Sequence, residues 1–72
     1  MGGVRILNKA MLRLVTGEDV CYDFCDDWIE ADTILMEIKD KPFIKVTDKK
    51  DRVLTIFSDK VIGCYIKKRR MF

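Results

Sequence analysis

The feature that most constrains the fold is a two-residue alternation of apolar and polar side chains that recurs in short runs. In the run 9–16, Ala10, Leu12 and Leu14 fall on one face and the intervening residues on the other. A β-strand with one buried face requires this period, because its successive side chains point to opposite sides. Similar runs, rich in the β-branched and aromatic residues that strands prefer, cover 20–25, 33–38, 43–47, 53–57 and 61–66.

Turn residues separate these runs at intervals of about ten residues. Gly17 supplies the positive φ that a tight hairpin between the first two runs needs. Breaks also fall at 40–42, 48–51 and 58–59. The pattern predicts a mainly β fold, a small antiparallel meander of about five strands bent into a barrel or sandwich. We expect residues 1–72 to form a single small domain with a short frayed N-terminus (1–4) and a basic C-terminal tail (67–72).

The alternation also assigns faces within the second run. Strict alternation places one set of its side chains toward the core, namely Val20, Tyr22 and Phe24. The other set is expected to face solvent, namely Cys21, Asp23 and Cys25.

The segment 27–39 supports two interpretations. Asp27 followed three residues later by Glu30 fits a helix capping box, and an apolar stripe continues at helical spacing through Trp28, Ala31, Leu35 and Ile38. The same segment places Ile34, Met36 and Ile38 on one side of a strand. We favour a strand with a bend. The alternative is an α+β fold, with one helix at about 27–39 packed on a four- or five-stranded sheet.

The residue types that are missing limit the chemistry. The 72-residue chain contains no His, which removes the usual general base and every imidazole metal ligand. It has no glycine-rich phosphate-binding motif. We therefore expect no enzyme activity, no catalytic residues, no cofactor and no metal site. No apolar run approaches the roughly 20 residues of a membrane span, so we expect a cytoplasmic protein with no membrane partner.

Three cysteines, Cys21, Cys25 and Cys64, occur without a CxxC spacing. An odd number of thiols in a chain lacking a recognisable secretory signal fits a reducing compartment. Small, partly buried apolar side chains are the favoured interpretation. A metal or redox role and an intermolecular disulfide remain as alternatives.

Charge is distributed unevenly along the chain. Residues 18–32 hold seven acidic and no basic residues, whereas residues 39–72 hold eleven basic and four acidic ones. Basic residues near Tyr65 and Phe72 resemble a small nucleic-acid contact surface. The candidate contacts for nucleic acid or an acidic partner are Lys60, Lys67, Lys68, Arg69 and Arg70.

Several runs carry apolar residues on both faces. A chain this short cannot bury two apolar faces alone, so a second layer or a partner subunit must cover one of them. Barrel closure is the competing explanation. The candidate self-association residues are Met11, Val15, Trp28, Ile62 and Ile66, and a homodimer is the first expectation.

Two stretches, 12–20 with its central Gly17 and 53–66 with its tight turn, loosely resemble Sm-like and SH3-like small β-barrels. The RNA-binding motifs of that family are not matched, so the resemblance assigns no binding residue. The chain also resembles short β-rich prophage proteins of Gram-positive bacteria in general style.

We expect a non-enzymatic interaction or regulatory module that acts through protein–protein contacts as a homo-oligomer, encoded by a phage or mobile element. The alternative is a nucleic-acid-binding small barrel that uses the basic C-terminal segment. Small-ligand binding at a subunit seam has less support.

Overall fold

The computed structural model describes residues 8–68 as a five-stranded antiparallel sheet with one short helix. The frayed segment predicted at 1–4, and Arg69 and Arg70 of the basic tail, lie outside the described residues. The elements follow in the order β1 (Asn8–Leu14), β2 (Asp19–Cys25), α1 (Ala31–Lys39), β3 (Phe43–Thr47), β4 (Val53–Phe57), the short 3-10 helix η1 (Ser58–Lys60) and β5 (Val61–Lys67).

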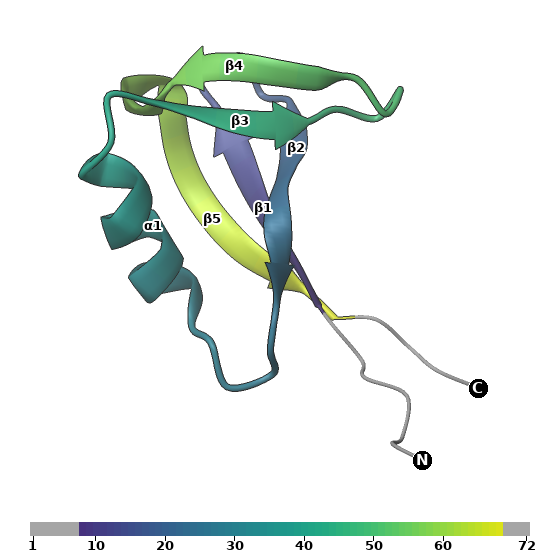
Figure 1. Cartoon of the computed structure of the whole chain (residues 1–72), viewed down its shortest axis with the longest axis vertical. Coiled ribbons are helices and arrows are strands. Elements are labelled where there is room, and N and C mark those ends of the chain that lie inside the picture. The colour runs from purple at the N-terminus through teal and green to yellow at the C-terminus, as the bar shows by residue number, and fades with distance from the viewer. Residues whose placement is uncertain (1–7, 69–72) are drawn as a thin grey trace.

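The strand order across the sheet is β4-β3-β2-β1-β5. Strands β1, β2 and β5 run side by side, and the β3–β4 hairpin lies across one end of them (Figure 1). A mainly β fold with five antiparallel strands is confirmed. The predicted barrel is wrong, because β4 and β5 are both edge strands and do not pair with each other.

The middle segment contains a helix, so the favoured strand at 33–38 is wrong. Helix α1 begins four residues later than the alternative helix at 27–39, with Glu30 as its N-cap. Ile34 and Ile38, one helical turn apart, are buried, whereas Met36 is 73% exposed. A strand would have placed all three on one face, and packing of the i, i+4 pair against the sheet selects the helix instead.

The first and second strands meet in the predicted hairpin. Gly17 has φ +92°, a conformation that favours glycine. The N–H of Leu14 donates to the Glu18 carbonyl at 2.9 Å and that of Gly17 donates to the Leu14 carbonyl at 2.8 Å, which closes the turn.

A β-bulge in β2 reverses the predicted orientation of some of its side chains. Ala10 pairs with Asp23 and Met11 with Cys21, so Tyr22 is an extra residue on β2. The extra residue reverses the alternation beyond it. Phe24 is therefore 48% exposed, and Cys25, predicted to face solvent, packs against the core.

A second bulge lies in β5, where Arg13 pairs with Gly63 but Leu14 pairs with Val61. Ile62 is the extra residue and is 60% exposed. The core forms where the inner face of the bent sheet meets α1. Its buried apolar residues are Ala10, Leu12, Leu14, Val20, Ile34, Ile38, Ile44, Val46 and Val61.

Polar contacts fix η1 and α1 to the sheet. The buried Ser58 hydroxyl donates to the Lys41 carbonyl, and the Ser58 N–H donates to the Pro42 carbonyl at 3.1 Å. Lys39 Nζ donates to the carbonyls of Ser58 at 3.1 Å and Val61 at 2.7 Å. These contacts bring the end of α1 against the start of β5.

Among residues 8–68, no helix is long and apolar enough to cross a membrane.

Candidate functional site

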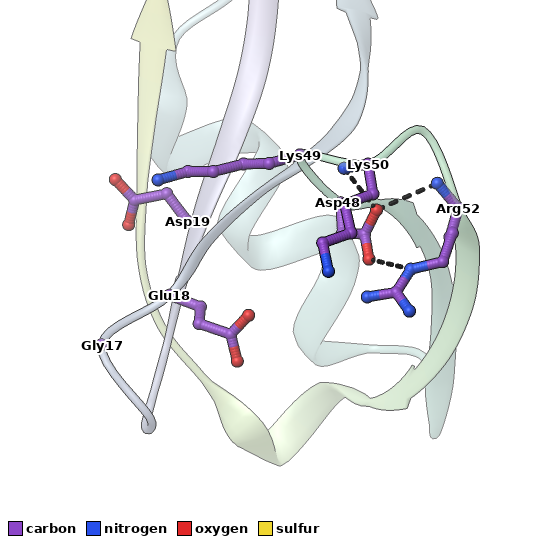
Figure 2. Close-up of a pocket in the computed structure, with 7 residues that line it drawn as sticks. All are labelled: Gly17, Glu18, Asp19, Asp48, Lys49, Lys50 and Arg52. Atoms are coloured by element: carbon purple, nitrogen blue, oxygen red, sulfur yellow. Dashed lines mark hydrogen bonds and ion pairs between the residues drawn. The ribbon is translucent and has the colours of Figure 1, made fainter.

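One hollow, of about 370 Å³, lies between the β1–β2 turn and the β3–β4 turn. Figure 2 shows the side chains that line it, and Lys49 extends across the gap toward Asp19. The lining is almost entirely charged and comprises Gly17, Glu18, Asp19, Asp48, Lys49, Lys50 and Arg52.

Asp48 organises the β3–β4 turn rather than presenting a free carboxylate. Its Oδ1 accepts the backbone N–H groups of Lys50 and Arg52, both at 2.9 Å, and its Oδ2 accepts Arg52 Nε at 2.8 Å. The backbone N–H of Arg52, followed by its guanidinium, lowers the pKa of Asp48 below its usual value. Asp51 in the same turn has φ 60°, a conformation that aspartate tolerates better than most residues.

Asp19 has a similar structural role on the neighbouring strands. Arg13 Nε donates to its Oδ1 at 3.0 Å, and the Tyr65 hydroxyl donates to its Oδ2 at 2.8 Å. The hydrogen bond from Arg13, then that from Tyr65, lowers the pKa of Asp19. Asp19 thus ties β2 to β1 and β5 across the outer face of the sheet.

Two of the carboxylates that line the hollow are engaged in hydrogen bonds. Asp19 and Asp48 are held as hydrogen-bond acceptors with lowered pKa values, whereas a general base at neutral pH needs a pKa near 7. The geometry supports a structural role for these two carboxylates, with Lys49 and Lys50 exposed at the rim.

The structure separates the predicted basic contacts that it describes. Lys60 lies in η1 and Lys67 at the far end of β5, roughly 20 Å away at about 3.3 Å per strand residue. Lys68 follows Lys67 and is exposed. Lys67 is instead paired across the sheet with Lys9, a residue that sequence analysis did not select.

The predicted self-association residues do not form one patch. Trp28 is 76% exposed in the loop between β2 and α1, while Val15 is 54% and Ile62 60% exposed near the opposite end of β1. Met11 is half-buried on the outer face of β1. Ile66 is half-buried and packs against the core.

A different apolar surface lies on the β3–β4 hairpin. Three of its residues are well exposed: Phe43 (55%), Phe57 (62%) and Val53 (68%). The rings of Phe43 and Phe57 meet edge to face across the two strands, with centroids 6.5 Å apart. We call these three residues together with Leu54 the hairpin surface. Phe43, Val53 and Phe57 share the outer face of the hairpin, whereas Leu54 lies on its other face and is 38% exposed.

The sequence does not reveal the hairpin surface, because local pattern does not give the order of the strands. The run Val53–Phe57 reads VLTIF, with no charged residue, and so has the composition of a strand covered on both sides. In the structure it lies at the edge of the sheet. The absence of charge was visible in the sequence, but its position at an edge was not.

The three cysteines are free thiols and are half-buried. Burial is the largest cause of the raised pKa of each of the three thiols, and nearby carboxylates contribute in the same direction. Within the described part of the chain, no three cysteine or acidic side chains gather as a metal site.

Comparisons with family models, with curated proteins and with solved structures found no match for this chain.

Proposed function

We propose that the protein is a non-enzymatic interaction module that acts through protein–protein contacts as a homo-oligomer. One observation carries the proposal: the hairpin surface exposes a contacting pair of phenylalanines at one end of the edge strand β4 and a valine on the same face at its other end. Aromatic anchors of this kind contribute strongly to protein interfaces. A small domain gains by covering such side chains with a partner.

The mass of the protein in solution tests this function. We expect sedimentation at low micromolar concentration to give a mass above that of one 8.4 kDa chain. Replacing Phe43 and Phe57 by Ser should lower this mass to that of one chain, because it removes the aromatic pair. Met36→Ser, which changes an equally exposed residue on α1, is the matched control and should leave the mass unchanged. A wild-type protein that stays monomeric throughout would contradict the proposal.

A nucleic-acid-binding function is the second candidate, and one observation favours it. Lys9 and Lys67 are directly paired across β1 and β5, and like charges in this position repel each other unless an anion lies between them. Tyr65 offers a stacking surface on the same face. Single-stranded RNA or DNA should then bind with an affinity that falls steeply with salt. Lys67→Glu should abolish the binding, and salt-independent binding or none would reject this function.

The loose resemblance to Sm-like and SH3-like proteins is proposed only for the path of the first hairpin around Gly17, because the sheet is not closed into a barrel. No binding residue follows from it.

A further inference from the structure

We propose that β4 pairs with β4 of a second copy of this chain, antiparallel about a two-fold axis at Thr55, to make one continuous sheet. The inference rests on the proposed function, because it names the partner and the register of that interface.

The backbone groups of β4 point alternately toward β3 and away from it. The Asp48 N–H donates to the Arg52 carbonyl at 3.0 Å, and the Ser58 N–H donates to the Pro42 carbonyl at 3.1 Å. These two bonds flank the β3–β4 ladder, so residues 52, 54, 56 and 58 direct their backbone groups toward β3. Val53, Thr55 and Phe57 therefore direct theirs away from it.

Most of these outward groups have no partner among residues 8–68. The strand pairings and the other hydrogen bonds leave out the N–H groups of Val53, Thr55 and Phe57 and the carbonyls of Val53 and Thr55. The carbonyl of Phe57, the N-cap of η1, accepts the first hydrogen bond of that helix. In Figure 1 the outer side of β4 faces away from α1 and β5. A row of unpaired N–H and carbonyl groups is a template for another strand.

The spacing of the outward groups suits a copy of the same strand. With Thr55 opposite Thr55 of the second copy, Val53 lies opposite Phe57 of that copy, and Phe57 opposite its Val53. All three positions are outward ones. The Thr55 pair can exchange both of its backbone hydrogen bonds, and in each outer pair the Phe57 N–H can donate to the Val53 carbonyl. Thr–Thr pairs and pairs of an aromatic with a β-branched residue are favourable cross-strand neighbours.

The inner face of the hairpin is also completed by a second copy. Leu54 points to the same side as the buried Val46 yet is 38% exposed, because the sheet ends beside it. In the proposed register, Leu54 lies opposite Ile56 of the second copy. The apolar layer of the hairpin then continues across both molecules, and the exposed part of Leu54 is covered.

Charge within the strand does not oppose the pairing of two copies, because β4 carries no charged residue of its own. In the proposed register Arg52, which is paired with Asp48, lies opposite Ser58 of the second copy. Asp51 lies opposite Asp59, beyond the ends of the strand. The backbone groups and the apolar side chains therefore select this register, and the flanking charges do not.

Charge substitutions at Thr55 test the register. Thr55 is exposed with its side chain on the outer face, opposite Lys45 of β3. Thr55→Lys therefore adds one like-charge pair within each chain. It should lower the stability of the monomer slightly and leave the fold intact, as circular dichroism would verify. It would place two like charges opposite each other at the two-fold axis. We expect the dissociation constant of the dimer, measured by sedimentation, to rise about tenfold or more. Ile62→Lys is the control, because it adds the same charge at an exposed position of β5. It should leave the dissociation constant unchanged.

Mixing two variants tests whether the strand that pairs with β4 is β4 of a second copy. Thr55→Glu alone should weaken the dimer as Thr55→Lys does, and an equimolar mixture of the two should recover dimeric mass as a heterodimer. Recovery requires Thr55 to face Thr55 of a second copy. A Lys variant that dimerises like the wild type, or a mixture that stays monomeric, would overturn the inference.

These outcomes separate the inference from the function on which it rests. A wild-type protein that dimerises and loses its dimer on replacement of Phe43 and Phe57, but not on Thr55→Lys, keeps the proposed function and rejects the β4 register. A wild-type protein that is monomeric rejects both.

Discussion

The two edges of the sheet are built differently. At β5, α1 packs alongside, and Lys39 Nζ donates to the Val61 carbonyl at 2.7 Å; the strand ends in Lys67, followed by Lys68. Strand β4 contains no lysine of its own, although Lys45 of β3 lies opposite Thr55, and α1 packs on β5 rather than on β4. Lysine residues and covering helices are the usual means by which proteins prevent edge-to-edge pairing. The contrast indicates that this chain protects one edge and leaves the other available for a partner.

The largest effect should come from removing the cover of the β5 edge. Ile38, on the side of α1 that packs against the sheet, is fully buried, so Ile38→Ala should lower the free energy of unfolding by about 2–4 kcal/mol. Urea denaturation measures this change. Met36→Ala, on the exposed face of the same helix, is the control. It should lower the free energy of unfolding by less than about 0.5 kcal/mol. Equal losses in the two variants would show that α1 does not pack as described.

Proline substitutions test the direction of the β4 backbone groups. Ile56→Pro removes an N–H that points toward β3, and should destabilise the monomer by about 1–3 kcal/mol because its partner carbonyl loses a donor. Thr55→Pro removes an outward N–H and should cost the monomer clearly less. Both variants are compared by urea denaturation at a concentration where each is monomeric. A larger loss for Thr55→Pro would reverse the assignment of the free edge.

Lys39→Met tests the polar protection of β5. The substitution keeps much of the apolar stem but removes the donor to the Ser58 and Val61 carbonyls. We expect a loss of about 1 kcal/mol, since the carbonyls can regain water at the partly exposed edge. Lys41→Met removes a more exposed lysine with longer contacts of 3.4 Å and should change stability less. If the two variants lose the same amount, the Lys39 contacts do not stabilise this edge.

The smallest effects should come from pH. Asp19 ties Tyr65 of β5 to β2, and Asp48 holds the turn that leads into β4. Both have folded-state pKa values below the ordinary value of about 3.9. Their contribution is therefore complete above that pH and is lost as pH falls through the folded-state pKa.

Asn variants at the two positions separate the contributions of the two edges. Asp19→Asn and Asp48→Asn should each be less stable than the wild type at pH 7, and the difference should shrink as pH falls below about 4. Thermal unfolding across this pH range measures it. A difference that stays constant with pH would mean that the charge of the carboxylate is not what stabilises the turn.

Local pattern was enough to predict the strands but not their environment. Strands β3 and β4 match the predicted runs 43–47 and 53–57, because both runs are rich in β-branched residues and a charged turn separates them. The hairpin at Gly17 was predicted because a glycine lies between two alternating runs. Which strands lie at the edges depends on pairings between distant residues, and no local pattern encodes them.

Two predictions were wrong for physical reasons: the orientation of side chains beyond the bulges, and the strand at 33–38 where α1 forms. Tyr22 and Ile62 are extra residues in bulges, and each bulge reverses the side of every residue beyond it. Ile34 and Ile38 satisfy both a strand of period two and a helix of i, i+4 spacing. Their burial against the sheet decided between the two.

The seam between β2 and β3 has a consequence for how the molecule moves. In the described chain, these strands share a single bridge, between Cys21 and Thr47, whereas β3 and β4 pair along their whole length. Local opening follows the line with the fewest bonds to break. We therefore expect the β3–β4 hairpin to separate from the rest of the sheet as one unit. Its amide protons would then exchange with deuterated water together, and sooner than those of β1.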